Sequence, residues 1–165
     1  MVGDAAAACR SVYTFIEQND PYRMSADDYA LDTELTGLDQ LARIALWARQ
    51  GARIVDFAYV QPALTAQQEP DPNLVYAVLG APGPTLHPGF LSQHLERFFA
   101  ISVLKGADAR SNAEARQQLD SLAECAAQGR RLALLDVQDI HRLPDPGAVD
   151  ISGERRTLRA VLRPV

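Results

Sequence analysis

The sequence predicts an α+β fold, in which a sheet of four or five antiparallel or mixed strands is covered by helices. Three observations support this class. Short apolar runs of strand length alternate along the chain with longer stretches of helical periodicity. The 165 residues suit a single domain with a substantial core. Hydrophobic residues make up 47% of the chain and charged residues 22%, proportions that indicate a folded protein rather than a disordered one.

The first 37 residues are predicted to form a helical extension that precedes the α+β domain of residues 38–165. In the segment Asp4–Glu17, apolar side chains recur at helical spacing, and Pro21 follows as a stop signal. Ser25 then caps a weaker helix that ends near Gly37. This extension has no chemical motif of its own.

The first half of the α+β domain alternates helix and strand signals. Leu38–Gln50 is its clearest helix, with Gly51 as the stop. Arg53–Val60 places Val55, Phe57 and Tyr59 on one face and Ile54, Asp56 and Ala58 on the other, which predicts a half-buried strand. Pro62–Pro72 contains too many prolines to continue a sheet and is predicted to be a loop. Leu74–Leu79 is the next predicted strand.

The central strand of the predicted sheet is Leu95–Leu104, because apolar side chains occur at both its odd and its even positions. A helix is predicted from Ser111 to Gln128, since Ser111 and Glu114 have the spacing of a capping box. Gly129 ends that helix. We expect it to pack on one face of the sheet through Ala115, Leu119, Leu122 and Ala126.

Two further strands complete the predicted sheet. Arg131–Val137 is the first, and a turn at Leu143–Gly147 follows it. The last predicted strand is Thr157–Arg163, in which Leu158 and its apolar neighbours face one way and Arg159 the other.

The sequence contains no catalytic signature, so we expect no enzyme and no cofactor. No pair of the three histidines, His87, His94 and His141, has the spacing that places two imidazoles on one metal ion, so no metal site is predicted. Cys9 and Cys125 are expected to be small buried hydrophobic residues. A net charge of −5 argues against a protein that coats nucleic acid. No apolar run has the length of a membrane span.

The order of the predicted elements carries the one resemblance to a known family. A helix, a strand and a proline-rich loop lead to the strand segment Asp71–Gly80 and the longer segment Glu96–Gly106. A capped helix, Asp108–Gln128, and the C-terminal segment Thr157–Arg163 follow. In this order, residues 38–165 resemble the tail terminator family of tailed bacteriophages, small proteins that cap the tail tube as a hexameric ring.

The resemblance implies a structural virion protein that joins the tail tube to the head connector. Its partners would be further copies of itself in a ring, the tail tube protein and the head–tail connector protein, with DNA passing through the lumen. It would occupy the host cytoplasm during assembly and then the virion tail. The alternative is a small bacterial binding protein of the immunity type, which neutralises a partner and is a monomer or dimer with an acidic face for a basic toxin. A small enzyme would instead require polar residues that converge on a pocket.

The charge distribution suggests where contacts form. Residues 1–39 contain eight acidic residues, whereas four arginines and no acid lie in residues 155–163. In a ring, the basic edge of one subunit would meet the acidic face of the next, or an inward-facing arginine would touch DNA. The alternative is that the arginines are simply solvated on an edge strand. The predicted interface residues are Arg155, Arg156, Arg159, Arg163, Trp47, Gln67, Gln68 and Glu69.

If this interface forms, replacing Arg159 and Arg163 together by Ser is expected to weaken assembly with little change in thermal stability.

Overall fold

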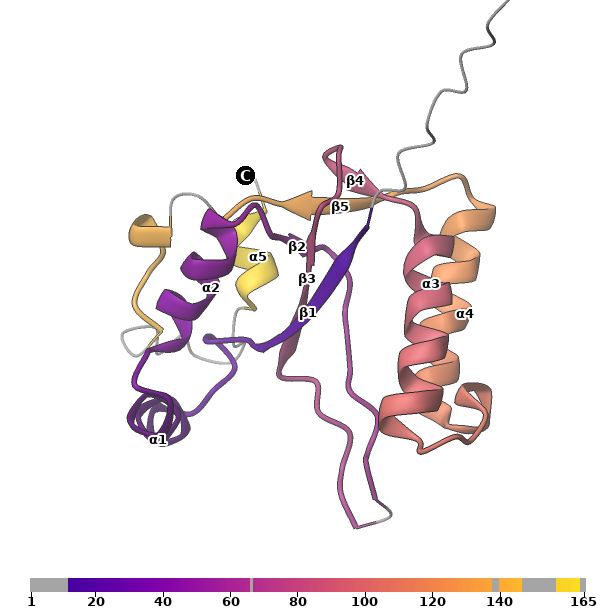
Figure 1. Cartoon of the computed structure of the whole chain (residues 1–165), viewed down its shortest axis with the longest axis horizontal. Helices are drawn as coiled ribbons and strands as arrows, with labels where there is room; N and C mark the ends of the chain where they lie inside the picture. The colour runs from indigo at the N-terminus through magenta and orange to yellow at the C-terminus, as the bar shows by residue number, and fades with distance from the viewer. Residues whose placement is uncertain (1–11, 66, 138–139, 147–156, 164–165) are drawn as a thin grey trace, which may run out of the picture.

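The computed structural model describes residues 12–65, 67–137, 140–146 and 157–163. In this part of the chain, an antiparallel sheet of five strands lies between two groups of helices (Figure 1). The strand order is β1-β3-β2-β5-β4. The predicted α+β class, with an antiparallel sheet of four or five strands, is therefore confirmed.

The strands are β1 (Thr14–Asn19), β2 (Arg53–Val55), β3 (Leu74–Leu79), β4 (Thr85–Leu86) and β5 (Leu132–Leu135). The α-helices are α1 (Ala26–Thr36), α2 (Gln40–Arg49), α3 (Pro88–Phe98), α4 (Ala113–Ala127) and α5 (Leu158–Leu162). A π-helical segment, η1 (Phe99–Val103), continues α3, and short 3-10 turns form η2 (Ala109–Ser111) and η3 (Ile140–Arg142). Figure 1 shows α1, α2 and α5 on one side of the sheet and α3 and α4 on the other.

β3 is buried on both faces because helices cover both sides of the sheet. Val75 and Ala77 pack in the core that includes α2 and α5, whereas Tyr76 and Val78 pack in the core that includes α3 and α4. These four side chains are at most 3% exposed. Burial on two faces explains why the sequence of β3 is a continuous apolar run and does not alternate with polar residues.

Four predicted elements are confirmed near their expected ends, namely α1, α2, α4 and β3. Ser25 caps α1, and Gly37 ends it with a φ of 70°. At α4 the cap is Asn112, whose side chain accepts a hydrogen bond from a backbone N–H of the first turn at 3.0 Å. This cap lies one residue after the predicted Ser111. The predicted apolar face of α4 is confirmed by the complete burial of Ala115, Leu119 and Leu122.

The predicted central strand Leu95–Leu104 is wrong, because α3 and η1 cover all but its last residue. Its side chains face the core along one helical stripe and do not alternate across a sheet. The stripe repeats every fourth residue and consists of Leu91, Leu95, Phe99 and Val103, none of which is more than 1% exposed. The predicted strand began at Leu95 and so left out Leu91, the first residue of this stripe. The apolar residues that remain occur at odd and even positions, as in a strand that is buried on two sides.

The N-terminal segment contributes a strand to the sheet. The helix predicted over Asp4–Glu17 is wrong for Thr14–Glu17, which belong to β1, and residues 4–11 lie outside the described residues. β1 pairs antiparallel with β3 along its whole length. Phe15 packs against the core beneath α3, and Ile16 packs against the core beneath α2.

The last predicted strand, Thr157–Arg163, is also wrong. It forms the helix α5, and the Thr157 side chain caps this helix by accepting a hydrogen bond from the Ala160 N–H at 3.1 Å. The strand predicted over Arg131–Val137 is confirmed as β5. The strand predicted over Arg53–Val60 is shortened to the three residues of β2.

A buried glutamine fixes the chain that follows β2. The Gln118 side chain on α4 accepts from the Val60 N–H at 3.0 Å and donates to the Val60 carbonyl at 2.8 Å. It therefore pairs with this backbone as a neighbouring strand would. The predicted loop Pro62–Pro72 follows and is closed at its base by a bridge between Gln61 and Asp71.

Candidate functional site

Two of the arginines predicted to form an interface are paired within the fold. Arg159 and Arg163 belong to α5 and its C-terminal cap, and both donate to the carboxylate of Asp56, which follows β2. The nitrogen–oxygen distances are 3.2 Å from Arg159 and 2.8 Å from Arg163. Arg155 and Arg156 lie outside the described residues. The edge strand that was expected to display these guanidinium groups is therefore a helix braced against the sheet.

The two arginines differ in their surroundings. The Arg159 side chain is only 17% exposed, and burial lowers the pKa of its guanidinium although Asp56 opposes this shift. The Arg163 side chain is 56% exposed, and its hydrogen bonds to Asp56 raise its pKa. Arg159 therefore acts as an internal brace, whereas Arg163 adds a second contact at the surface.

The remaining predicted interface residues lie at the surface in two different places. Trp47 on α2 is 38% exposed and lines a groove beside β1. Gln67, Gln68 and Glu69 are exposed in the loop after β2, where Gln68 and Glu69 line a depression formed by residues 61–73 alone. The structure thus does not gather Trp47 and the loop residues around one pocket.

The groove beside Trp47 contains several polar atoms without partners. It lies between α2 and the outer strand β1, and we call it the β1–α2 groove. Among the described residues, neither amide atom of Gln18 has a hydrogen-bond partner. The same holds for Oε1 of Gln40 and for Nε of Arg43. Gln40 is only 2% exposed, and an unpaired buried polar atom costs about 1–3 kcal/mol. The residues that line the groove are Glu17, Gln18, Asn19, Gln40, Arg43, Trp47 and Leu74.

The hydrogen-bond pattern of β1 shows which of its backbone groups face outward. Directly after β1, the Asp20 N–H donates to the Asn73 carbonyl at 2.8 Å. In an antiparallel ladder such bonded pairs recur at every second residue. Gln18 and Ile16 therefore also direct their N–H and C=O groups toward β3.

The intervening residues of β1 direct their backbone groups to the open edge of the sheet. Phe15 and Glu17 occupy these positions, and β1 is the last strand in the sheet order. Asn19 has the same orientation, and its carbonyl accepts a hydrogen bond from Nε2 of Gln40 at 2.9 Å. Figure 1 views the sheet from this edge, with β1 in front, α2 on one side and α3 on the other. Among the described residues, the edge is thus closed at Asn19 and open toward Thr14.

An acid–aromatic cluster lies on the face of β1 that is directed toward α3. The Tyr59 hydroxyl donates to the Glu17 carboxylate, and the Tyr76 hydroxyl is 2.8 Å from Nε2 of His94. The Phe15 ring stacks on the His94 ring, with 4.1 Å between their centroids. The members of this cluster come from four separate segments, so no local pattern in the sequence predicts it.

Burial shifts the pKa values of this cluster. It raises the pKa of Glu17, Tyr59 and Tyr76 and lowers the pKa of His94. Such shifts occur at active sites, but they also occur in packed cores. Tyr59 and Tyr76 are only 2% and 3% exposed, so a substrate would have little access to their hydroxyl groups. The arrangement favours a structural role for the cluster.

His87 has a different role from His94. His87 caps α3, and its Nδ1 accepts a hydrogen bond from the Gly89 N–H at 3.0 Å. His87 therefore serves as the cap of this helix. Cys125 is buried, as predicted, whereas Cys9 lies outside the described residues.

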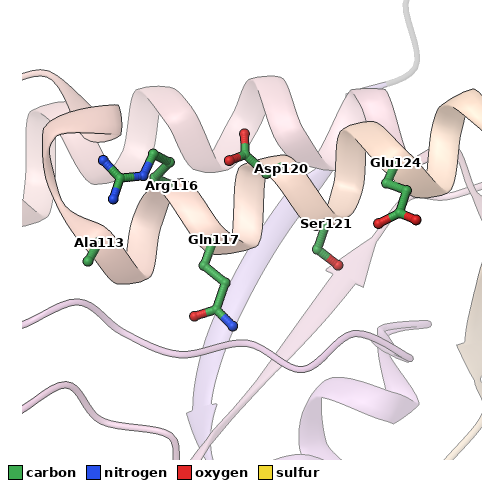
Figure 2. Close-up of a pocket in the computed structure, with 6 residues that line it drawn as sticks. All are labelled: Ala113, Arg116, Gln117, Asp120, Ser121 and Glu124. Atoms are coloured by element: carbon green, nitrogen blue, oxygen red, sulfur yellow. The ribbon is translucent and has the colours of Figure 1, made fainter.

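A shallow depression on α4 is lined by one helix only. Figure 2 shows the side chains of Arg116, Gln117, Asp120, Ser121 and Glu124 along the exposed side of this helix, with Ala113 at its start. No other element contributes a lining residue. A depression without an opposing wall cannot enclose a ligand, so it carries no candidate site.

The surface of α1 is the most unusual part of the described chain. None of the 11 residues of α1 is buried. Leu31 is 53% exposed and Leu35 is 77% exposed. The helix also carries four acidic residues and no basic one, and one of these acids, Asp32, pairs with Arg43 of α2. We call Leu31, Leu35 and the acidic residues Asp27, Asp28, Asp32 and Glu34 the α1 surface.

Within the described residues, no group of three or more His, Cys, Asp or Glu side chains is placed to hold a metal ion. No helix in the same part of the chain is long and apolar enough to cross a membrane. Comparisons with models of protein families, with curated proteins and with solved structures find no match.

Proposed function

We propose that this protein binds another protein through the α1 surface and that its role is binding rather than catalysis. The observation that carries this proposal is that no side chain of α1 is fully buried and that both of its leucines are exposed. Helices of 11 residues are marginally stable on their own and are usually held by an apolar face packed on the core. Leu31 and Leu35 are four residues apart and therefore lie on one face of α1, but this face is exposed. A partner protein would cover it.

The charge of the α1 surface indicates the chemistry of that partner. Four acidic residues and no basic residue lie on α1, and the whole chain has a net charge of −5. Complementary charges speed association and orient two proteins as they dock. The partner is therefore a basic protein with an apolar contact patch.

The two narrower roles expected from the sequence are supported to different degrees. An immunity-type protein that neutralises a basic partner needs an acidic face, and the α1 surface supports that role. A tail terminator role draws less support, because the segments within Glu96–Gly106 and Thr157–Arg163 that carried the resemblance as strands form helices. The proposal therefore rests on the α1 surface and not on the order of the elements.

The experiment uses a double variant of the α1 surface, Leu31→Ala with Leu35→Ala, and a matched control. The control is Leu64→Ala, because Leu64 is a loop leucine that is 45% exposed. Each immobilised protein is exposed to a lysate of the cells that produce it, and captured proteins are quantified by mass spectrometry. We expect a basic protein whose capture falls about tenfold or more in the double variant, since contact-centre side chains contribute over 1 kcal/mol each.

Two further measurements make this result specific. The free energy of unfolding should change by less than about 0.5 kcal/mol in the double variant, because both leucines are exposed. Capture by the wild type should weaken as salt rises from about 0.05 M to about 0.5 M, because salt screens exposed charges. If every captured protein is retained equally by the wild type and the double variant, the α1 surface is not the binding site.

A further inference from the structure

We propose that the open edge of β1 pairs with β1 of a second copy of this chain, so that two five-stranded sheets join across a two-fold axis. The contact would lie along Thr14–Asn19, apart from the α1 surface, and it does not depend on the function proposed above. The proposal rests on the backbone pattern of β1, on its lack of edge protection and on the side chains that flank it.

The outward backbone groups of β1 are complementary to themselves. Phe15 and Glu17 each present an N–H and a C=O to the open edge, as the pairing of β1 with β3 requires. A second copy of β1 running antiparallel presents the same groups in reverse order. With the two-fold axis at Ile16, Phe15 of each copy pairs with Glu17 of the other, and both pairs are bonded through their backbones.

This register also places two polar side chains opposite each other. It places Gln18 of one copy opposite Thr14 of the other, on the side of the sheet that carries α2. Thr14 is exposed and Gln18 is partly buried, so this pair adds no charge and no bulky side chain to the seam. A threonine hydroxyl can both donate and accept a hydrogen bond. A register centred on Glu17 is disfavoured, because it would oppose two carboxylates.

β1 has little of the protection that exposed edge strands usually carry, since Glu17 is its one charged residue and Gln40 covers the edge only at Asn19. Such strands are usually short or carry lysine, proline or a bulge. β1 has six residues without lysine or proline and pairs with β3 in continuous register. The opposite edge strand, β4, has only two residues and is protected by its shortness.

Exposed aromatic side chains flank β1 on both faces of the sheet. Trp47 on α2 is 38% exposed and lines the β1–α2 groove together with Gln18. Phe90 on α3 is 39% exposed, and its ring centroid is 4.6 Å from that of Tyr13, which directly precedes β1. Both aromatic side chains would therefore lie beside the seam between the two copies.

Trp47 and Phe90 matter because two paired strands alone bury too little area for a stable interface. A stable interface buries about 800 Å² on each partner, and a pair of six-residue strands alone does not reach that area. A buried aromatic side chain contributes roughly 150–250 Å² when it is fully covered. We therefore expect Trp47 and Phe90 to supply much of the apolar area of the contact.

The test measures the mass of the intact protein and the exchange of its backbone amides. Sedimentation at increasing concentration should show the 18.0 kDa chain converting to a species of twice that mass. Hydrogen exchange followed by NMR should show slow amides at Ile16 and Gln18 at every concentration, because they bond to β3. The amides of Phe15 and Glu17 should exchange rapidly in the monomer and become slow in the dimer.

Two variants with matched controls test the contact itself. Thr14→Lys places a charge on the edge and should raise the dimer dissociation constant at least about tenfold, whereas Thr65→Lys in the loop should leave it unchanged. Trp47→Ala should weaken the dimer by a similar factor, whereas Leu64→Ala should not.

Three outcomes would overturn the proposal. The first is a mass of 18.0 kDa at every concentration up to about 1 mM. The second is a dimer in which Phe15 and Glu17 exchange as fast as in the monomer. The third is a dimer that is broken by Leu31→Ala with Leu35→Ala but not by Thr14→Lys, since its contact would then be the α1 surface. The first two results do not bear on whether the α1 surface binds a basic protein, which the capture experiment decides.

Discussion

Asp20 is a buried carboxylate that links the end of β1 to α5. It accepts hydrogen bonds from the Leu158 N–H at 3.0 and 2.9 Å and from the Tyr22 N–H at 3.0 Å. The residue is only 1% exposed. Burial raises the pKa of this carboxyl, and the two backbone N–H groups oppose the shift. One side chain thus satisfies the first turn of α5 and the turn after β1.

Replacing Asp20 by Ala should lower the free energy of unfolding by about 1–3 kcal/mol, because two backbone N–H groups lose their acceptor. Urea denaturation followed by circular dichroism measures this change. Asp27→Ala is the matched control, since Asp27 is exposed on α1, and its change should stay within about 0.5 kcal/mol. Equal stabilities of the two variants would contradict the linking role of Asp20.

The raised pKa of Asp20 also predicts a pH dependence. Because the folded protein holds this proton more tightly than the unfolded chain, the contribution to stability is fully present below the unfolded pKa of 3.8. It is lost as pH rises through the folded pKa. The variant Asp20→Asn has no titrating group at this position. The unfolding free energy of the wild type minus that of Asp20→Asn should therefore fall as pH increases above 3.8. Denaturation at a series of pH values measures it, and a rising difference would contradict the sign of the shift.

Asp56 changes the expectation for the C-terminal arginines. Because Arg159 and Arg163 both pair with Asp56, replacing them together by Ser should reduce thermal stability. Arg159→Ser alone should cost about 1–3 kcal/mol, since it leaves a partly buried carboxylate with a weaker partner. Arg163→Ser alone should cost less than about 1 kcal/mol, because the Arg163 side chain is 56% exposed and Asp56 keeps its bond to Arg159. Calorimetry on the two single variants tests the order, and the reverse order would rule out the bracing role of Arg159.

At the scale of elements, Gln118 joins α4 to the chain after β2. Gln118→Glu should lower the free energy of unfolding by about 1–3 kcal/mol, because a carboxylate cannot donate to the Val60 carbonyl. The exchange of the Val60 amide should also accelerate. Gln117→Glu is a control on the adjacent, exposed position of the same helix. If both variants behave alike, charge on α4 and not the lost hydrogen bond explains the effect.

At the scale of the whole molecule, pairing through β1 predicts that stability depends on protein concentration. A dimer stabilises the folded state by mass action, so the melting temperature of the wild type should rise with concentration. The melting temperature of Thr14→Lys should rise much less over the same range. Differential scanning fluorimetry from about 1 μM to about 1 mM compares the two. Parallel curves for wild type and variant would argue against this contact.

The amino-acid sequence by itself determined the elements whose signals are local. α1 and α2 lie between cap and stop residues, such as Ser25 and Gly37 for α1. α4 has a fully buried stripe at helical spacing and a cap within one residue of the predicted one. β3 and β5 are short apolar runs between turns. In each case the information lies within about 15 residues, so a single pass along the chain identifies the element.

Only the tertiary structure decided β1, α3, α5 and the surfaces they create. Thr14–Asn19 is a strand because β3, distant in the sequence, pairs with it. The five residues of α5 fit a helix or a strand equally well, and the Asp20 carboxylate bonded to its first N–H favours the helix. The open edge of β1 and the uncovered face of α1 follow from the same long-range packing. They could not be predicted because short segments lack the periodicity that separates strand from helix, and because burial depends on which distant residues arrive as neighbours.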